Sequence, residues 1–418
     1  MEQVFASIIT IGDELLIGQV VDTNSAWMAQ ELNKAGIWLK RRVAVGDDKH
    51  EIINALEAQA QDTQIILMTG GLGPTADDIT KPVLADYFGG KLVVHQPTLQ
   101  HLHHLFENIY RRPLTDRNLK QAELPDVCTV LPNLRGSAPG MWFEKEGRIY
   151  ISLPGVPHEM KGLMTAEVLP RLQKHFTMPH IAHRTMLTAG IGESFLADVI
   201  QEWEQQLPAH LKLAYLPNYG MVRLRITGSG SDKDQLEQEL DEQFARLKVL
   251  AKQWMVIDED LPLHEVVGRR LKEQGKTMAT AESCTGGYIA HLITSVPGSS
   301  AYYKGSVISY ANEVKENLLS VSPATLAATG AVSEDTVQQM VQGALSSLHT
   351  DYALATSGIM GPDGGSAEKP VGMVWIAVGN REKIVTQQFN FRFDRMRNIE
   401  LTANHSLNLL RKFIEEHG

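Results

Sequence analysis

Hydrophobic positions follow two alternating patterns in the first part of the chain. Short apolar runs typical of buried strands lie at residues 4–10, 39–45 and 64–68. Segments with apolar residues at helical spacing fill the intervals, at residues 24–36 and 51–60. Because strands and helices alternate, we predict a parallel sheet with helices on both faces, which is a three-layer αβα domain.

The pattern changes after Pro179, in a stretch that favours a domain boundary. A strand pattern at residues 184–188 is followed by a helix that runs through Trp203. A half-exposed strand at residues 222–226 then precedes a strongly charged amphipathic helix at residues 232–252. These elements predict a small α+β unit.

A third pattern begins near Leu261 and again alternates helices with strands. An amphipathic helix at residues 266–274 precedes the first strand of this part. The predicted strands lie at residues 277–281, 303–310, 352–356 and 373–378. We therefore predict a second α/β domain. The predicted domains are residues 1–170, 178–257 and 261–418.

Length, charge and cysteine content limit the classes of protein. A chain of 418 residues is long enough for two or three domains. Its 39 Lys and Arg against 49 Asp and Glu leave a net charge of −10, which provides no general attraction to nucleic acid or to anionic membranes. Two cysteines exclude a disulfide framework and fit a reducing compartment. The first residues do not resemble a signal peptide and no apolar run reaches membrane-spanning length, so a cytoplasmic protein is expected.

A glycine-rich loop follows the third predicted strand. Gly70, Gly71 and Gly73 allow the backbone to approach a phosphate group closely. Thr75 is placed to cap the next helix, with Asp78 three residues later as in a capping box. In a parallel sheet such a loop lies at the carboxyl ends of the strands, where ligands bind. We therefore predict a phosphate-binding loop.

Four carboxylates belong to this loop and to an earlier corner of the chain. They are Asp13, Glu14, Asp77 and Asp78. Carboxylates beside a phosphate site are suitable ligands for magnesium or manganese, so we predict a divalent metal site here. The alternative is that Asp77 and Asp78 only complement a helix dipole, which explains the acids but not the glycines.

A hydroxyl and a thiol stand side by side where the first strand of the last domain turns into a helix. Backbone N–H groups at such a corner are unpaired, so it can hold a nucleophile, Ser283 or Cys284, and stabilise an oxyanion. The amides near Thr285, Gly286 and Gly287 are the expected donors to that oxyanion. Chemistry alone favours the thiol, because it is intrinsically more reactive. The alternative is that Ser283 and Thr285 simply cap the helix.

A lysine near the start of a later helix is a candidate general base. With Asn312 as the expected cap, Lys315 falls in the first helical turn, where the helix dipole disfavours its ammonium form. Burial would lower the pKa of Lys315 further, so that it could take a proton from a serine. Tyr310, at the end of the preceding strand, could relay or orient that proton. The alternative is a solvated surface lysine.

A second glycine-rich loop occupies residues 357–372. Gly361, Gly364 and Gly365 permit close approach of the backbone to a ligand. So long a loop in a compact domain is more often functional than structural, so we predict that it contacts the substrate. The alternative is a surface hairpin.

Several of these segments resemble one known family. They are GGLGPTADDIT, GDELL and VDTNS in the first domain, and ESCTGG, SYANEVK, GAVSE and SGIMGPDGGSAEKPVG in the last. Over nearly its whole length the chain resembles full-length proteins of the CinA family. The resemblance implies a molybdopterin-binding-like first domain, a KH-like middle module, and a last domain that hydrolyses nicotinamide mononucleotide to nicotinate mononucleotide and ammonia. It further implies an ADP-ribose pyrophosphatase in the first domain that uses a divalent metal (magnesium, manganese or cobalt), and no cofactor for the amidase.

The resemblance also implies roles for individual residues. The family's catalytic serine, tyrosine and lysine fall on Ser283, Tyr310 and Lys315. Its arginine that meets the substrate phosphate corresponds to Arg395, although Phe393 stands where the family usually has glycine. The middle module lacks a GXXG loop, so no nucleic-acid binding is expected. The expected partners are the two nucleotides and a second copy of the chain in a homodimer. The alternative is that the first domain binds a pterin or nucleotide without cleaving it.

Overall fold

The computed structural model describes residues 3–75, 77–218 and 220–417. The chain divides into two compact units, one of Met1–Ala182 with Gly228–Gln238 and one of His183–Thr227 with Glu239–Gly418. Among the described residues, no helix combines the length and the apolar character that crossing a membrane requires.

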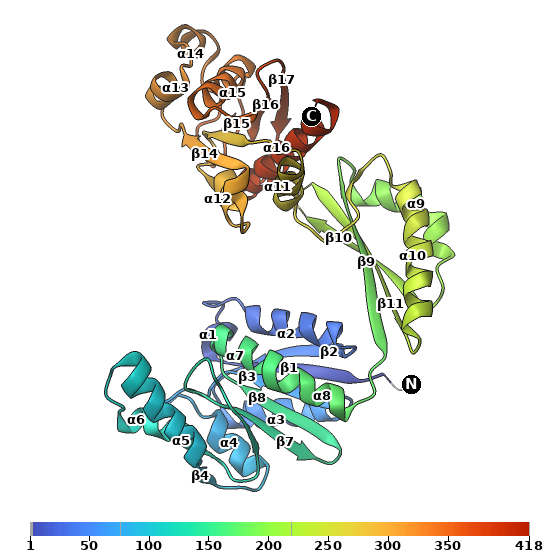
Figure 1. Cartoon of the computed structure of the whole chain (residues 1–418), viewed down its shortest axis with the longest axis vertical. Helices are drawn as coiled ribbons and strands as arrows, with labels where there is room; N and C mark the ends of the chain where they lie inside the picture. Colours follow the sequence, from blue (N-terminus) through green and yellow to red (C-terminus); the bar gives the residue numbers. More distant parts are fainter. Residues whose placement is uncertain (1–2, 76, 219, 418) are drawn as a thin grey trace. The chain divides into compact units, whose positions relative to one another are not determined.

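The first unit is built on a six-stranded sheet (Figure 1). Its strands are β1 Phe5–Ile11, β2 Trp38–Val45, β3 Ile65–Thr69, β6 Thr129–Leu131, β7 Gly140–Lys145 and β8 Arg148–Leu153. They lie in the order β2-β1-β3-β8-β7-β6. The first four are parallel, as the sequence predicts, whereas β7 and β6 extend the sheet in antiparallel fashion.

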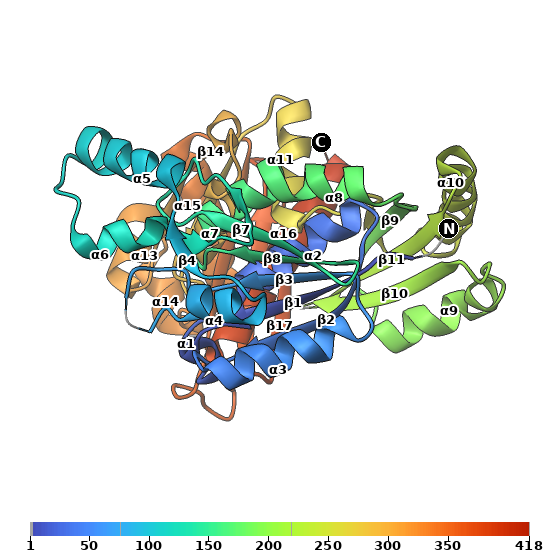
Figure 2. The ribbon, with the colours of Figure 1, turned by 90° about the horizontal axis from the view of Figure 1, so that it is seen from below.

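Helices cover both faces of this sheet because its central strands are apolar on both sides (Figure 2). On one face Ile8 belongs to the same buried cluster as Leu32, and on the other Ile9 belongs with Leu56. The first face is covered by α2 Thr23–Lys34, α7 Pro157–Leu163 and α8 Leu169–His175, and the second by α3 Lys49–Ala60 and α4 Thr80–Tyr87. The three-layer αβα architecture is thereby confirmed.

Smaller elements complete this unit. They are the helices α1 Asp13–Leu16, α5 Gln96–His103 and α6 Asp116–Leu119, the π-helical turns His104–Tyr110 and Met164–Val168, the 3-10 turn Lys120–Ala122, and the strand pair β4 Leu92–Val94 and β5 Glu123–Pro125.

The next part of the chain forms a small α+β module. Its strands are β9 His180–Ala189, β10 Leu211–Asn218, β11 Met221–Gly230 and β12 Met255–Ile257, in the order β10-β11-β9-β12. Its helices are α9 Glu193–Gln205 and α10 Lys233–Leu250. Leu196 and Ile200 of α9 and Leu240 and Leu247 of α10 are buried, as expected for helices that cover a sheet.

The rest of the second unit is an α/β fold around a five-stranded sheet. Its strands are β13 Met278–Glu282, β14 Tyr303–Ile308, β15 Tyr352–Gly358, β16 Met373–Gly379 and β17 Ile384–Asn390. They lie in the order β14-β13-β15-β16-β17, and the first three are parallel.

Helices again cover both faces of this sheet. Those that share a core with Met278 and Leu354 are α11 Leu263–Glu273, α12 Tyr288–Thr294 and α16 Arg395–His417. Those on the face of Ala281 and Ala355 are α13 Asn312–Leu319, α14 Pro323–Thr329 and α15 Glu334–Leu348, with a 3-10 turn at Ser299–Ala301 elsewhere in the fold. The predicted order of an αβα domain, an α+β module and an α/β domain is confirmed.

The strand register brings distant corners of each sheet together. In the first unit Thr69 pairs with both Thr10 and Leu153, so the corners after β1, β3 and β8 share one edge of the sheet. In the second unit Glu282 pairs with both Ile308 and Thr356, so the corners after β13, β14 and β15 do the same. Ligands of α/β sheets bind at such edges, and both candidate sites lie there.

Candidate active site

The hydroxyl of Ser283 and the amine of Lys315 meet at the edge of the second sheet. Ser283 directly follows β13, and Lys315 lies in the first turns of α13. The Nζ atom of Lys315 is 3.0 Å from the Oγ atom of Ser283, which is hydrogen-bonding distance. Two residues that are 32 positions apart in the sequence are therefore in direct contact.

The surroundings of Lys315 favour its neutral form. The residue is only 1% exposed, and burial lowers its pKa from the ordinary value of 10.5. Its Nζ atom donates to the backbone oxygens of Ser309, at 2.6 Å, and Tyr310, at 3.3 Å. Its third contact is a donation to Oγ of Ser283. Once the amine is neutral, it keeps two N–H bonds for the two carbonyls and has a lone pair for the hydroxyl of Ser283. The geometry is that of a base poised to accept the serine proton.

Burial removes the thiol of Cys284 from consideration as a nucleophile. The side chain lies in an apolar cluster with Met360, Val374 and Ile376. Burial raises the pKa of Cys284 to about 12, so the thiol stays protonated near neutral pH. The thiol of Cys284 is therefore neither ionised nor accessible to a substrate. The hydroxyl of Ser283 is the group that contacts Lys315.

Helix α12 is not capped by the residues that the alternative interpretation named. The N-cap position is Gly287, which has no side chain to accept a hydrogen bond. The carboxylate of Glu282 accepts from the amides of Gly287, Ile289 and Ala290 instead. The hydroxyl of Thr285 donates to the same carboxylate. Glu282 was not among the predicted site residues; an acid at the end of an otherwise apolar strand was the signal that the sequence offered.

The amides that can stabilise an oxyanion differ from those predicted. The N–H of Gly286 donates to the oxygen of Ser283, and that of Gly287 donates to Glu282, so both are occupied. Within residues 3–75, 77–218 and 220–417, the amides of Cys284 and Thr285 have no acceptor. The loop therefore uses the amides of Gly286 and Gly287 internally, and of the predicted donors only the amide of Thr285 is left available.

Tyr310 contacts the lysine through its backbone rather than through its hydroxyl. Its side chain is 64% exposed, and its hydroxyl accepts a hydrogen bond of 3.2 Å from Nη2 of Arg395. Among the described residues it makes no hydrogen bond to Ser283 or Lys315. The tyrosine hydroxyl thus pairs with Arg395, and we refer to these two exposed side chains as the mouth of the site. The predicted relay of the proton by Tyr310 has no hydrogen bond in support among the described residues. Asn312 is also not a cap, because α13 begins at Asn312 and Ala311 holds the N-cap position.

Arg395 connects the mouth of the site to the second glycine-rich loop. Its Nη1 atom donates to the oxygen of Gly361 at 2.8 Å. Phe393 is half exposed, and the guanidinium of Arg397 lies 4.1 Å from its ring centre. Gly364 and Gly365 are exposed and, in the part of the chain that the structure describes, make no hydrogen bond to Ser283, Lys315 or Arg395.

A buried asparagine, Asn398, holds the second glycine-rich loop and the segment before α16 together. It was not among the predicted site residues. The side-chain amide of Asn398, fully buried, donates to the oxygens of Met360 and Phe393. Its side-chain oxygen accepts from the amide of Phe393 at 3.3 Å. Because Arg395 and Gly361 lie in the joined segments, Asn398 fixes their separation.

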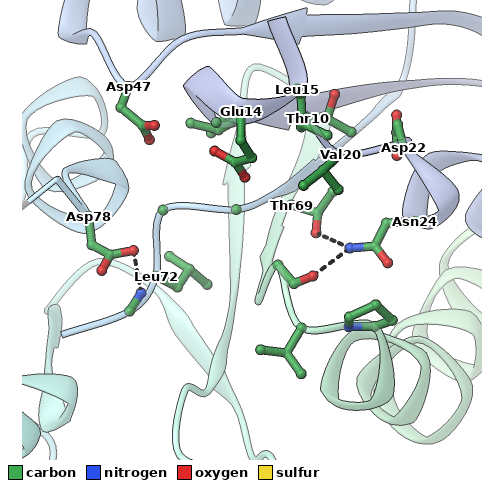
Figure 3. A pocket seen from close by; sticks show the side chains of 18 of the residues that line it. Thr10, Glu14, Leu15, Val20, Asp22, Asn24, Asp47, Thr69, Leu72 and Asp78 are labelled. Carbon is green, nitrogen blue, oxygen red and sulfur yellow. Dashed lines mark hydrogen bonds between the residues drawn. The ribbon is translucent and has the colours of Figure 1, made fainter. Parts of the chain in front are cut away.

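The second candidate site is a cavity of about 380 Å³ in the first unit (Figure 3). The predicted loop residues Gly70, Gly71 and Gly73 line it, together with Gly12. Gly70 has φ +117°, and a Cβ atom there would lie 2.1 Å from the oxygen of Ile11. Gly71 has φ +64°, and a Cβ atom there would lie equally close to the hydroxyl of Thr80. Only glycine fits at either position, which brings the backbone to the cavity wall.

Asp78 stabilises this loop rather than a helix start. Its carboxylate accepts hydrogen bonds of 2.8 Å from the amides of Gly73 and Thr75, and one from the hydroxyl of Thr75. Helix α4 begins at Thr80, with Ile79 at the N-cap position and no side-chain cap. The predicted capping role of Thr75 was therefore wrong, because α4 begins five residues after Thr75.

The four predicted metal ligands do not form a metal centre by themselves. Asp13 does not line the cavity; its carboxylate accepts from the amide of Asp47 at 3.2 Å. Glu14, Asp77 and Asp78 do line it, together with Asp47, which the sequence did not indicate. In the described ranges no three His, Cys, Asp or Glu side chains are grouped closely enough to hold a metal ion. Burial, and then the charges of Asp13, Glu14 and Asp77, raise the pKa of Asp47.

Comparison with family models divides the chain into three matches. Residues 7–174 match the model described as "Probable molybdopterin binding domain". Residues 183–254 match "Damage-inducible protein CinA KH domain", and residues 260–414 match "CinA C-terminal domain".

Similar proteins were found in sequence and in structure. A CinA-like protein of Cytophaga hutchinsonii is 47% identical over 99% of this chain and 99% of its own length, and one of Flavobacterium psychrophilum is 43% identical over 98% of each. Among solved structures, a CinA superfamily protein of Klebsiella pneumoniae is 35% identical, covers 37% of this chain and 99% of its own, and has a TM-score of 0.36. CinA of Thermoplasma acidophilum is 33% identical, with coverage of 42% and 99% and a TM-score of 0.37. The full-length sequence similarity, together with three family models in the predicted order, establishes that this chain belongs to the CinA family.

Proposed function

We propose that the C-terminal domain is an amidase that converts nicotinamide mononucleotide to nicotinate mononucleotide and ammonia. The observation that carries this proposal is the contact of 3.0 Å between Nζ of Lys315 and Oγ of Ser283 in a buried setting. A hydroxyl paired with a neutral amine is an activated nucleophile for acyl transfer. The substrate is suggested by the resemblance to the CinA family.

The proposed reaction proceeds through an ester of Ser283. As Oγ of Ser283 attacks the carboxamide carbon, its proton passes to Nζ of Lys315. The carbonyl oxygen becomes an oxyanion, to which the amides of Cys284 and Thr285 can donate. The C–N bond then breaks, and Lys315 returns the proton to the departing nitrogen, which leaves as ammonia. A water molecule, deprotonated by Lys315, cleaves the ester to yield the carboxylic acid and restores the serine.

The mouth of the site provides a cation for the phosphate of the substrate. Arg395 uses Nη1 on Gly361 and Nη2 on Tyr310, which fixes its guanidinium while other N–H groups remain for a phosphate. We therefore assign Arg395 to phosphate binding and Tyr310 to holding the guanidinium.

Incubation of the full chain with nicotinamide mononucleotide tests the amidase directly. We expect stoichiometric ammonia and nicotinate mononucleotide, with no effect of a chelator, because Ser283 and Lys315 suffice for the chemistry. Nicotinamide riboside, which lacks the phosphate, should be hydrolysed far less efficiently. Failure to release ammonia under any of these conditions would refute the proposed activity.

A second candidate function is hydrolysis of ADP-ribose in the first domain, and the cavity there favours a diphosphate. Gly70 and Gly71 line one wall of the cavity. The amide of Gly70 donates to the oxygen of Leu153, so the amide of Gly71 is the one that could meet a phosphate oxygen there. Five carboxylates line the cavity, those of Glu14, Asp22, Asp47, Asp77 and Asp78, and its described lining includes no Lys, Arg or His. An anionic ligand would therefore be repelled unless it enters with its own cations. A divalent cation that enters together with the diphosphate would supply this neutralisation, because no three of the described carboxylates are grouped closely enough to hold an ion by themselves.

Binding of ADP-ribose should consequently depend on a divalent metal even before any cleavage. Calorimetric titration of the full chain is expected to detect binding with magnesium, manganese or cobalt and none with a chelator. Asp77→Asn should weaken the metal-dependent binding, whereas Asp62→Asn, at a surface carboxylate paired with Arg41, should not. Equal affinity with and without chelator would contradict the proposal, and binding without turnover would leave a binding module as the role of this domain.

A further inference from the structure

The proposed reaction leaves one buried charge without a role. Glu282, the residue before Ser283, is fully buried at the end of β13. It forms no ion pair with Lys, Arg or His within the described ranges. Burial of an unpaired carboxylate is costly, and an apolar residue at this position would serve the packing of the strand better. The acid must therefore be retained by its hydrogen bonds.

Those hydrogen bonds join the strand to the helix across the nucleophile. Three groups donate to Oε2 and two to Oε1, and they come from β13, from the corner itself and from the start of α12. The donors are the Thr285 hydroxyl (2.8 Å) and the amides of Gly287 (3.0 Å) and Ile289 (3.1 Å) for Oε2, and the Ala290 amide (2.8 Å) and Thr280 hydroxyl (3.2 Å) for Oε1. Residues 283–286 are thereby enclosed between a carboxylate on the strand and amides on the helix.

This arrangement determines which amides stay free. In an ordinary cap, the side chain of residue 287 itself would accept from the first amides of α12. Such a cap would make no contact with β13 and would not restrain the backbone of residues 283–286. Glu282 instead reaches across the corner, so the chain must turn at Gly286 and Gly287, which have φ +60° and +96°. The amides of Cys284 and Thr285, which directly follow Ser283, are then left without an acceptor in the described part of the chain.

Glu282 also connects the two members of the reactive pair. Its backbone oxygen accepts from the amide of Ser309 at 2.8 Å. The backbone oxygen of Ser309 in turn accepts from Nζ of Lys315 at 2.6 Å. One residue therefore positions the loop of the nucleophile through its side chain and the base through its backbone.

We propose that Glu282 is the positioning residue of this site, whose carboxylate holds the loop of residues 283–287 so that the Ser283 hydroxyl faces Lys315 beside two free amides. The kinetic part of this inference rests on the proposed amidase, whereas the restraint on the loop does not. The two parts are therefore measured separately.

The restraint is tested on Cys284, which lies inside the loop and is 5% exposed. Cys128→Ser leaves Cys284 as the single thiol, since the chain has two cysteines. In this background Glu282→Gln keeps the size of the side chain but replaces one oxygen with an NH2 group that faces N–H donors. We expect Cys284 to lose its protection against a thiol reagent under native conditions. The matched control is Asp351→Asn, because Asp351 accepts from Thr277 at the opposite end of β13; there, Cys284 should stay protected.

The kinetic measurement separates positioning from general destabilisation. Displacement of a nucleophile by about 1 Å costs on the order of 100-fold in rate, so Glu282→Gln should lower kcat for nicotinamide mononucleotide by about that factor. KM should stay near that of the unsubstituted chain, because Arg395 and Gly361 are untouched. Asp351→Asn should leave kcat and KM unchanged, even if it lowers the midpoint of thermal unfolding as much as Glu282→Gln does.

Each outcome decides the matter. Continued protection of Cys284 in the folded Glu282→Gln chain overturns the proposal, as does an unchanged kcat. If Glu282→Gln does not fold, Thr285→Val takes its place, because it removes one donor and keeps the carboxylate. For the proposal to stand, Thr285→Val must lower both the protection of Cys284 and kcat, each in part. If the unsubstituted chain releases no ammonia while Glu282→Gln exposes Cys284, the amidase is refuted and the restraint by Glu282 is upheld.

Discussion

Ser283→Ala should abolish ammonia release from nicotinamide mononucleotide, with kcat reduced by about 10⁴-fold or more, as for other enzymes that lose their nucleophile. The physical reason is that no second nucleophile is available. Cys284 is the adjacent candidate, but burial raises its pKa to about 12 and places its thiol in an apolar cluster. The alanine removes only a hydroxyl, so the fold and the contacts of Arg395 should persist.

The measurement is steady-state ammonia release together with the affinity for the substrate. Ser283→Ala should still bind nicotinamide mononucleotide, because the groups at the mouth of the site are unchanged. Ser295→Ala is the control, since Ser295 is an exposed serine after α12 whose hydroxyl donates to the oxygen of Leu292; its rate should equal that of the unsubstituted chain. If the Ser283→Ala variant retained full activity, another residue would have to be the nucleophile, and the assignment of Ser283 would be refuted.

Lys315→Met should lower kcat by roughly 10²- to 10⁴-fold, the contribution usual for a positioned general base. Methionine is of similar size and apolar, so the buried space stays filled while the lone pair that faces Ser283 is lost. Lys304→Met, at an exposed position on β14, provides the matched control and should be without effect. Activity of Lys315→Met at the rate of the control would exclude lysine as the base.

The stability of Lys315→Met distinguishes loss of chemistry from loss of fold. Burial lowers the pKa of Lys315 below its ordinary value of 10.5, so between the two values the unfolded chain binds more protons than the folded one. In that pH window this group makes stability rise with pH, and at neutral pH it works against folding. The methionine variant should therefore be at least as stable as the unsubstituted chain near pH 7, with a shallower rise towards alkaline pH, measured by chemical denaturation.

The same lowered pKa predicts the pH profile of the unsubstituted chain. Only neutral Lys315 can accept the serine proton, so kcat/KM should increase as pH rises through the pKa of Lys315 in the folded protein. This limb of the profile should be absent from the residual activity of Lys315→Met. A profile that is flat, or that falls over this range, would contradict the role of the lysine.

Hydrophobic periodicity alone determined much of the architecture. Apolar runs of strand length alternating with amphipathic helices predicted β1, β2 and β3 and the helices between them, because the faces of a sheet and of a helix must be buried against each other. The antiparallel extension by β7 and β6 was not predicted, since strand direction follows from long-range pairing and leaves little trace in local sequence. The glycines of the first loop were recognised because positive φ angles and close backbone approach restrict those positions to glycine.

The tertiary structure alone decided the chemistry of the sites. Whether Lys315 is a surface cation or a buried base depends on residues brought against it from β13 and β14, and its contact with Ser283 spans 32 positions. The choice between Ser283 and Cys284 depends on which side chain points into the apolar core, which a corner sequence does not specify. The capping role of Glu282, the place of Tyr310 beside Arg395, and the separation of Asp13 from the cavity likewise result from packing between distant segments. Local sequence determines which groups are present, whereas the pKa, the partner and the direction of each group are set by the burial and the neighbours that only the folded chain provides.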